Sequence, residues 1–374
     1  MADKHLHIIS FDVPYPANYG GVIDVFYRVK ALSEAGVKVH LHCYEYGRGE
    51  QVALNHYCDV KYYKRDASFV RQLSLTPYIV ASRNSEDLVN DLLNDDYPIL
   101  CEGLHTTAIL NDNRLRDRKI FVRAHNVEHD YYRALAESEK SVWKRLFYKA
   151  EAWKLRRYEP ILSKAKGIFA ITQSDADYFT GKYQNVSLIP GFNALDSVCS
   201  ETGRGDYVLY HGNLSVRENA DAAEWLIENV FSELEIPCVI AGLNPSEKLQ
   251  RIASEYPNIT LTANPDDAEM IDLLRQAQIN ILVTHQPTGL KLKLLNALYN
   301  GRFCLVNSDM LQGTALQPLC VVKDEPEEII AEIKRLMDED FTEEDIDERD
   351  AALHQLYRND ENAKKIVGLI FGGN

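Results

Sequence analysis

The sequence predicts an α/β protein with two doubly wound parallel sheets, one in each half of the chain. Three observations lead to this fold class. Short apolar runs alternate with amphipathic helical patterns along nearly all of the 374 residues, and this alternation is typical of parallel sheets covered by helices on both faces. A chain of this length exceeds what one hydrophobic core usually holds. The polar stretch SETGRGD separates two such series, as a linker between domains does.

The first half begins with a strand, a loop and a helix. The strand is HLHIISF, the loop is rich in Pro, Asn and Gly, the helix ends at Gly36, and the strand KVHLHCY follows. Gly20 and Gly21 stand at the entrance of the helix, where missing side chains let backbone N–H groups approach a ligand closely. The pattern is not GxGxxG, so the dinucleotide-binding fingerprint is absent. A simple turn explains the paired glycines as well.

Further strands of the first half are predicted at CDVKYY, PILC, KIFVRA, GIFAI and NVSLI. His125, Asn126 and Glu128 come directly after KIFVRA, at the carboxyl end of that strand. Ligands of open α/β sheets collect at this edge. These side chains are therefore candidate functional residues, although a histidine at such a place can also cap a loop.

Residues 140–166 contain a long predicted helix with an unusual composition. Trp143 and Trp153 lie at helical spacing with other apolar residues. The basic side chains around them are Lys144, Arg145, Lys149, Lys154, Arg156 and Arg157. A basic helix with exposed tryptophans binds an anionic membrane surface. More often such aromatics pack in the core while the cations form a solvated face, and we favour this second interpretation.

The second half repeats the alternation, with strands predicted at YVLYHG, PCVIAG, NITLT, INILVT, FCLV and CVV. Its central segment consists of a strand at residues 279–284, a Gly-bearing loop, a helix at residues 290–300 and a strand at residues 303–306. At about 100° per residue, four polar or small residues of this helix fall within an arc of about 60°. They are Gly289, Lys293, Asn296 and Asn300.

This polar stripe has two explanations. It starts at a helix N-terminus, where free N–H groups and the helix dipole favour an anion, and Lys293 adds a positive charge one turn further on. A phosphate group therefore fits the pattern. The solvent-facing side of an amphipathic helix has the same appearance.

The composition excludes several classes of function. A net charge of −15 repels a polyanion, so nucleic-acid binding is not expected. The seven cysteines include no CxxC pair and mostly lie in apolar runs, which favours free thiols in a reducing cytoplasm. The N-terminus lacks the apolar core of a signal peptide, and no run is long enough to span a bilayer. We therefore expect a cytoplasmic protein, placed peripherally at the inner face of the membrane if the basic helix docks there.

Taken together, the motifs resemble those of glycosyltransferases of the GT-B fold, most closely the retaining family 4. The resemblance rests on PYPANYGG, RAHNVEHD, FAITQSDADYF, VSLIPGFN, YHGNLSVRENADAAEWL and PTGLKLKLLNALYNGRFCLV, and it covers nearly the whole chain. It implies two Rossmann-like domains that face each other across a cleft. Residues 1–196 form the acceptor-side domain, residues 205–345 form the domain that binds the nucleotide sugar, and helices in residues 346–374 return to the first domain.

The resemblance also implies roles for individual residues. In that family the His after the N-domain strand contacts the transferred sugar and basic residues of the second domain bind the diphosphate, so His125 and Lys293 are the expected catalytic residues. The expected donor-binding residues are Gly20, Gly21, Arg217, Thr288, Gly289, Leu290 and Asn296. The expected acceptor-side residues are Asn126, Glu128 and His105.

The sequence departs from the family at several of these positions. An acidic pair of the family falls on Thr288 and Asn296, so neither carboxylate is present. The second of these glutamates ordinarily accepts both ribose hydroxyls, whereas Asn296 offers one acceptor and an amide donor. The family commonly has Arg and Lys where Asn213 and Asn219 stand here. The resemblance therefore implies weaker or altered nucleotide binding.

The activity implied by the resemblance is that of a metal-independent hexosyltransferase. It transfers a sugar from a nucleoside diphosphate sugar to a glycan or a lipid-linked acceptor with retention, and it needs no cofactor besides this substrate. Two alternatives stay open. A nucleotide-sugar epimerase on the same fold needs no acceptor, and a degenerate homologue binds a sugar nucleotide or a partner protein without catalysis, as the loss of both glutamates allows.

Overall fold

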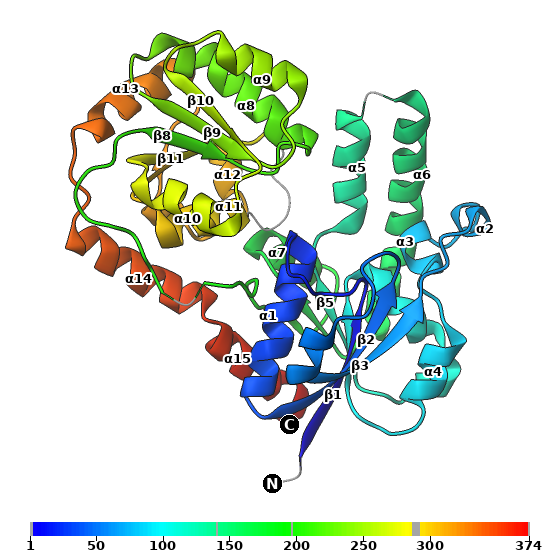
Figure 1. Cartoon of the computed structure of the whole chain (residues 1–374). Coiled ribbons are helices and arrows are strands. Elements are labelled where there is room, and N and C mark those ends of the chain that lie inside the picture. The colour runs from blue at the N-terminus through cyan, green and yellow to red at the C-terminus, as the bar shows by residue number, and fades with distance from the viewer. Residues whose placement is uncertain (1–2, 140, 196, 286–291, 373–374) are drawn as a thin grey trace. The chain divides into compact units, whose positions relative to one another are not determined.

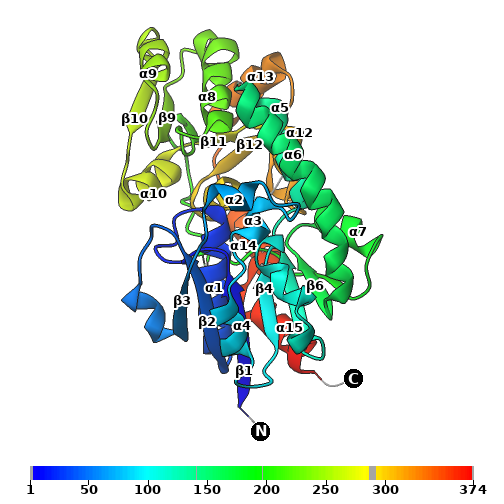
Figure 2. The same ribbon diagram turned by 90° about the vertical axis from the view of Figure 1, so that its right-hand side faces the viewer.

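The computed structural model describes residues 3–139, 141–195, 197–285 and 292–372. The chain divides into two compact units, each built on its own sheet (Figures 1 and 2). The N-unit comprises Met1–Ala194 and Tyr357–Asn374, and the C-unit comprises Leu195–Leu356. The prediction of two doubly wound α/β domains is confirmed.

The N-unit sheet has seven parallel strands in the order β3-β2-β1-β4-β5-β6-β7. The strands are β1 (Lys4–Ser10), β2 (Val37–Glu45), β3 (Cys58–Lys64), β4 (Ile99–Glu102), β5 (Ile120–Ala124), β6 (Gly167–Ala170) and β7 (Val186–Leu188). Each strand predicted in the first half corresponds to one of them. The direction of winding reverses between β1 and β4, so the loops after these two strands diverge at the carboxyl edge, where ligands of such sheets bind.

Helices cover both faces of the N-unit sheet. The helices α1 (Gly20–Glu34) and α15 (Asn359–Phe371) lie side by side on one face and share a hydrophobic core with it (Figure 1). The opposite core includes residues of α3 (Tyr78–Ala81), α4 (Glu86–Leu92) and α7 (Gln173–Thr180). The last helix of the chain thus belongs to the first unit, as the fold prediction states.

Two further helices of the N-unit form a hairpin. The helices α5 (Glu128–Ser138) and α6 (Val142–Tyr158) pack along each other (Figure 1). Glu151 and Leu155 of α6 are buried, whereas Trp143 is 82% exposed and Trp153 is 53% exposed. The prediction that these tryptophans pack in the core is therefore wrong, because α6 packs against the unit through the face of Glu151 and Leu155.

The C-unit sheet has six parallel strands in the order β10-β9-β8-β11-β12-β13. The strands are β8 (Val208–His211), β9 (Cys238–Gly242), β10 (Ile259–Ala263), β11 (Ile279–Leu282), β12 (Phe303–Val306) and β13 (Val321–Val322). They correspond to the six predicted strands, although β11 ends before the predicted residue 284. The order again reverses next to the first strand, between β8 and β11, which places a ligand-binding edge at the end of β8.

The helices of the C-unit are α8 (Arg217–Asn229), α9 (Glu247–Ser254), α10 (Asp267–Gln276), α11 (Leu292–Asn300), α12 (Ser308–Leu311), α13 (Pro326–Met337) and α14 (Glu343–Tyr357). The central helix α11 buries its leucines at positions 294, 295 and 298, as its amphipathic pattern predicts. The first residues predicted for this helix lie outside the described part of the chain. None of the helices in the described ranges combines the length and apolar character that crossing a bilayer requires.

Candidate functional site

The loop after β1 is held at its start by hydrogen bonds. Asp12 is 4% exposed and accepts from the next backbone N–H at 2.8 Å and from the hydroxyl of Tyr19 at 2.6 Å. In the first turn of α1, a Cβ atom at Gly21 would come within 2.6 Å of the ring of Phe11. Glycine at this position therefore lets the helix begin against the aromatic ring. Ligand binding by Gly20 and Gly21 stays a prediction.

Two histidines flank Phe11 at the carboxyl edge of the N-unit sheet. The ring of His125, after β5, lies 5.4 Å from that of Phe11, and the ring of His105, after β4, lies 5.2 Å from it. The side chains of His125 and His105 are 10% and 20% exposed. Asn126 is half-buried in the loop between His125 and α5. The structure thus brings together predicted residues from two different loops.

A buried network of charges supports His125. Its Nε2 atom lies 3.0 Å from Oε2 of Glu102, which is 0% exposed at the end of β4. Arg28 of α1 donates to the other oxygen of Glu102 and also to Asp24. Arg123 of β5 donates to Asp24 at 2.9 Å and to two backbone carbonyls after β7. The network therefore ties α1, β4, β5 and the loop after β7 together next to the imidazole.

This network orients the imidazole of His125. A carboxylate only accepts hydrogen bonds, so its position next to Nε2 selects the tautomer that donates from Nε2 and leaves Nδ1 as an acceptor. Burial alone raises the pKa of Asp24, but the charges of Arg123 and Arg28 outweigh it and hold that pKa well below its usual range. The carboxylate of Asp24 is therefore ionised at neutral pH and neutralises the two guanidinium groups.

Three residues of this network also have the spacing of metal ligands. Ligand atoms of Asp24, Glu102 and His125 all lie within 4.8 Å of one another. The carboxylate oxygens already accept from Arg28 and Arg123, so the cluster has its cations within the protein. This donor set fits an ion-pair network better than a bound metal. That the activity needs no metal ion stays a prediction.

The second histidine–carboxylate pair, His105 and Glu128, is built differently. Nδ1 of His105 lies 3.9 Å from Oε1 of Glu128, beyond hydrogen-bond distance. Both atoms are buried, and neither has a hydrogen-bond partner among the described residues. Burial raises the pKa of Glu128 to about 8 and lowers that of His105 well below its ordinary value. At neutral pH a protonated carboxyl and a neutral imidazole therefore face each other.

In the C-unit, Lys293 of α11 reaches the carboxyl edge at the end of β8. Its Nζ atom donates to Oδ1 of Asn219 at 2.9 Å and lies 5.5 Å from the centre of the Tyr210 ring. Asn219, in the first turn of α8, donates in turn to the backbone carbonyl of Asn213 at 3.0 Å. The loop after β8 and two helices therefore hold the ammonium group at the edge where a ligand is expected.

His211 is a residue of this edge that the sequence interpretation missed. It is 4% exposed, and Nε2 has no hydrogen-bond partner among the described residues. Burial and the charge of Lys293 lower its pKa to about 3. Gly212 follows His211 in the chain. A Cβ atom at Gly242 would lie 1.8 Å from the carbonyl oxygen of Gly212. Glycine at Gly242 thus allows the ends of β8 and β9 to approach closely.

The other predicted donor-binding residues lie in different environments. Arg217 begins α8 with a side chain that is 44% exposed and paired with Asp221 at 3.1 Å. Asn296 is exposed, whereas Asn300 is 5% exposed and donates to the backbone of Asn296 at 3.1 Å. Asn296 and Asn300 therefore differ in burial, and a common ligand for the polar stripe stays a prediction. Outside the described residues lie Thr288, Gly289 and Leu290.

The charged residues that support His125 were also missed, although the sequence contains a signal for some of them. Asp24 and Arg28 stand one helical turn apart in the apolar segment VIDVFYRV, and Arg123 interrupts the apolar strand IFVRA. Charged residues at positions where the apolar pattern predicts burial indicate buried ion pairs. Spacing alone does not identify the partners, since Asp24 and Arg123 are separated by 99 positions.

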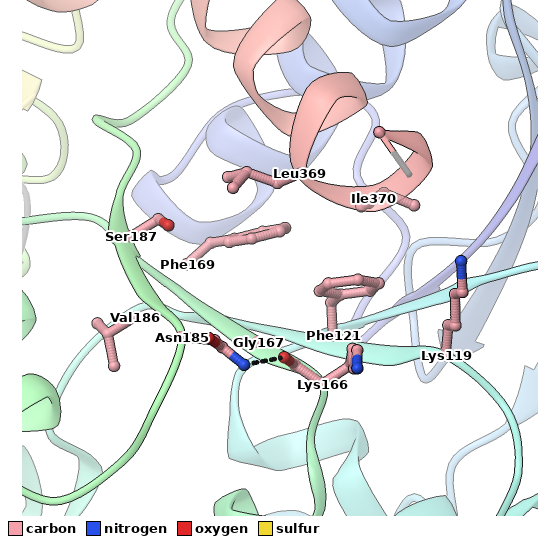
Figure 3. Close-up of a pocket in the computed structure, with 11 residues that line it drawn as sticks. Lys119, Phe121, Lys166, Gly167, Phe169, Asn185, Val186, Ser187, Leu369 and Ile370 are labelled. Atoms are coloured by element: carbon pink, nitrogen blue, oxygen red, sulfur yellow. Dashed lines mark hydrogen bonds between the residues drawn. The ribbon is translucent and has the colours of Figure 1, made fainter. Parts of the chain in front are cut away.

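A pocket of about 510 Å³ opens at the other edge of the N-unit sheet (Figure 3). It is lined by residues near the starts of β5, β6 and β7, such as Phe121 and Phe169, and by Leu369 and Ile370 of α15. Ligands of open α/β sheets bind beyond the carboxyl ends of the strands, whereas this pocket lies at their amino ends. The pocket therefore lies apart from the candidate site.

No protein-family model matches the chain. A relative described as an uncharacterised 44.6 kDa protein in the cps region of Klebsiella pneumoniae is 29% identical over 342 residues. The match covers 85% of this chain and 87% of that protein. The two proteins are therefore similar along most of their length.

Three solved structures are similar to nearly the whole chain. A variant of S. aureus TarM in complex with fondaparinux, α-GlcNAc-glycerol and UDP has a TM-score of 0.64 at 11% identity, covering 98% of this chain and 99% of that one. A trehalose-6-phosphate structure from E. coli with bound UDP-2-fluoro glucose scores 0.61 at 12% identity, covering 99% and 100%. Sucrose-phosphate synthase from Thermosynechococcus elongatus scores 0.61 at 13% identity, covering 98% and 95%.

At these identities the likeness shows the fold. The chain has two doubly wound domains and a last helix that belongs to the first of them, which is the predicted GT-B fold. Membership of family 4 stays a prediction.

Proposed function

We propose that the protein is a glycosyltransferase that moves a sugar from a nucleoside diphosphate sugar to a hydroxyl of a glycan or a lipid-linked acceptor. The observation that supports this most is the end-to-end fold similarity to structures that hold UDP, UDP-2-fluoro glucose or a glycan. The relative from a cps region points to polysaccharide biosynthesis. The residues at the carboxyl edge of each sheet supply the chemistry that this reaction needs.

In the proposed reaction, the C-unit binds the donor through its diphosphate. The ammonium group of Lys293 lies at the end of β8, held by Asn219 at 2.9 Å. When the bond between the sugar and the diphosphate breaks, negative charge develops on the leaving diphosphate. A positive charge already positioned at that place stabilises the transition state more than the ground state.

On the N-unit side, His125 orients the transferred sugar. The hydrogen bond between Nε2 and Glu102 leaves Nδ1 as an acceptor for a sugar hydroxyl. The residues Asn126, Glu128 and His105 serve the acceptor side. Because Glu128 and His105 are neutral at neutral pH, they offer the acceptor a polar but uncharged environment.

The proposed step conserves configuration at the sugar. The anomeric carbon loses its bond to the diphosphate oxygen and gains one to the acceptor oxygen on the same face, and the proton of the acceptor hydroxyl passes to the diphosphate. This route needs neither a carboxylate nucleophile nor a metal ion. It is compatible with Thr288 and Asn296 at the positions of the family glutamates.

A panel of UDP- and GDP-sugars tests the proposal in two stages. Thermal unfolding of the purified protein identifies the donor, since a ligand that binds the folded state raises the midpoint. Release of the nucleotide is then measured with the identified donor in the presence and absence of glycan and lipid-linked acceptors. The proposal predicts acceptor-dependent release that persists in EDTA, with the product anomer, read by NMR, matching that of the donor.

The same measurements separate the two alternatives. A change of the sugar in the absence of any acceptor would support the epimerase. Binding of a donor without turnover by any acceptor, or no binding at all, would support the degenerate homologue, whose motivation is the loss of both glutamates at Thr288 and Asn296.

A further inference from the structure

Exposed apolar side chains are concentrated in two short segments of the N-unit. Among the described residues, eight of the sixteen large hydrophobic side chains that are exposed lie in residues 69–75 and 142–153. Single exposed hydrophobics are ordinary on a soluble protein, whereas a concentration of this kind marks an interaction surface. The first segment contains Phe69, Val70, Leu73 and Leu75, with exposed fractions of 69%, 74%, 71% and 84%.

Hydrogen bonds attach the two segments to each other. The first contains the short helix α2 (Phe69–Gln72) and the second lies on α6. Lys154 of α6 donates to the backbone carbonyl of Gln72 at 2.8 Å, and Glu151 accepts from the backbone N–H of Tyr78 at 2.7 Å. These bonds attach the segment that carries α2 to the middle of α6. We call this combined surface the α2–α6 surface.

The exposed apolar residues of α6 form a stripe along one side of the helix. Trp143, Leu146 and Trp153 fall within an arc of about 80° on the helix, and the centre of that arc lies about 140° from the direction of Glu151 and Leu155. The latter two side chains are buried, and they define the face through which α6 packs. Trp143 is 82%, Leu146 54% and Trp153 53% exposed. The stripe therefore points away from the core of its unit.

The charge of α6 is opposite to that of the whole protein. The helix carries six basic residues and one acidic residue, VWKRLFYKAEAWKLRRY, while the chain has a net charge of −15. Arg157 lies over the ring of Trp153 at 5.0 Å from its centre, and Lys144, Arg145 and Lys149 are exposed. Long basic side chains that border exposed aromatic rings are suited to a surface with apolar and anionic layers. Such a surface therefore suits a partner that is both anionic and apolar.

We propose that the α2–α6 surface docks the protein on an anionic lipid bilayer. The tryptophans and the aliphatic side chains enter the headgroup region, and the cations of α6 bind lipid phosphates. A bilayer fits better than a protein partner, because large apolar side chains are exposed on both segments and the exposed charged side chains of α6 are all positive. The negative charge of the rest of the protein opposes other orientations. This inference does not depend on the proposed activity.

Sedimentation with vesicles tests the proposal. At low salt, the full-length protein should bind vesicles of phosphatidylglycerol and phosphatidylcholine and should not bind pure phosphatidylcholine. Replacing the exposed Lys149, Arg156 and Arg157 with Glu should weaken partitioning by at least about 100-fold, since each cation near an anionic membrane contributes roughly a factor of five. The matched control reverses three exposed cations elsewhere, Arg251→Glu, Lys334→Glu and Lys365→Glu, and should bind almost as the wild type does.

A fluorescence measurement reports insertion directly. Two of the three tryptophans of the chain lie on the α2–α6 surface, so a Trp225→Phe variant carries only these two reporters. Its emission should shift to the blue on anionic vesicles and should be quenched by brominated acyl chains. A Trp143→Ser and Leu146→Ser variant should lose vesicle binding and keep the wild-type unfolding midpoint, because both side chains are exposed.

Three results would overturn the proposal. The first is that the wild-type protein does not bind anionic vesicles at low salt. The second is that the charge-reversed α6 variant binds these vesicles as tightly as the matched control does. The third is that light scattering shows a dimer of the wild-type protein that the double variant Trp143→Ser/Leu146→Ser no longer forms. This result would assign the surface to a second copy of the chain. Stabilisation by a nucleotide sugar is measured on the same variants and should not change. A failure of the docking proposal is thereby distinguished from a failure of the proposed function.

Discussion

The carboxyl edges of the two sheets are built in different ways. In the N-unit, His125 rests on buried charges contributed by α1, β4 and β5, which bond to one another and to the loop after β7. In the C-unit, Lys293 of α11 donates to Asn219 and lies over the ring of Tyr210. The N-unit site is thus part of what holds its fold together, whereas Lys293 is half-buried at the surface of α11.

We therefore expect stability and activity to be coupled at the carboxyl edge of the N-unit sheet and separable at that of the C-unit sheet. A buried ion pair that loses one partner leaves an uncompensated charge, which costs far more than the pair contributes as a whole. A half-buried lysine at a helix surface has no comparable role in folding. Substitutions at the two edges should therefore have different effects on unfolding and on sugar transfer.

The largest effect on stability is expected for Arg123→Met. This substitution leaves the carboxylate of Asp24 with one guanidinium partner and two backbone carbonyls without their donor. We expect the free energy of unfolding to fall by about 3–5 kcal/mol, measured by denaturant titration. The control is Arg114→Met, whose exposed guanidinium pairs with Glu86 and Asp112 and should leave stability nearly unchanged. Equal losses in both variants would contradict the structural role of the network.

The second-largest effect that we expect is a pH-dependent change in the free energy of unfolding, caused by Glu128. Because burial raises its pKa from 4.5 to about 8, the folded state retains a proton that the unfolded chain releases between these values. The contribution of Glu128 to stability is therefore lost as the pH rises from about 4.5 to about 8, at up to about 1.4 kcal/mol per pH unit. Glu128→Gln keeps the neutral form throughout. The variant should become increasingly stable relative to the wild type over this range.

Denaturant titrations at about pH 5 and about pH 8 measure this difference. The control is Glu137→Gln, since Glu137 is an exposed carboxyl on the same helix and should show no comparable dependence. If the Glu128→Gln variant differed from the wild type equally at both pH values, the carboxyl of Glu128 would not be held neutral by burial.

The smallest effect is expected at Asn296, on the exposed side of α11. Asn296→Glu supplies the two acceptor oxygens that the family uses for the ribose hydroxyls, and its backbone bond to Asn300 stays in place. We expect the affinity for the nucleotide to rise by up to about tenfold, measured by calorimetry. Asn229→Glu, at an exposed position of α8, is the control. Unchanged affinity for every nucleotide would remove Asn296 from the site.

The same contrast between the edges explains how much the sequence predicts. Local patterns identify the strands, the amphipathic helix α11 and the position of Lys293, since helical periodicity depends only on nearby residues. They also place His125 at a strand end. The partners of His125 depend instead on contacts across the fold, as for Asp24 and Arg123, which are separated by 99 positions. No local pattern contains that information.

The surface of α6 shows a second limit of local patterns. A stripe of apolar residues at helical spacing usually marks a buried face, and this expectation failed for Trp143 and Trp153. The helix has a second apolar contact, Leu155, on its other side. Only the position of α5 and of the sheet decides which of two apolar faces is buried, so the tertiary structure was needed to identify the exposed one.

The most direct test of the account compares Lys293→Ala with Lys334→Ala. Both remove one positive charge from a helix of the C-unit, but Lys293 lies at the edge beside Asn219, whereas Lys334 is exposed on α13. With the identified donor and acceptor, kcat/KM of the Lys293→Ala variant should fall by about 30- to 1000-fold, corresponding to about 2–4 kcal/mol of transition-state stabilisation.

The Lys334→Ala variant should transfer sugar at the wild-type rate, and both variants should unfold at nearly the wild-type denaturant concentration. The rates are compared at equal concentrations of folded protein, which removes any difference in stability. Equal kcat/KM values for the two variants would contradict the account, because Lys293 would then be an ordinary surface lysine and the C-unit edge would have lost its proposed diphosphate-binding charge.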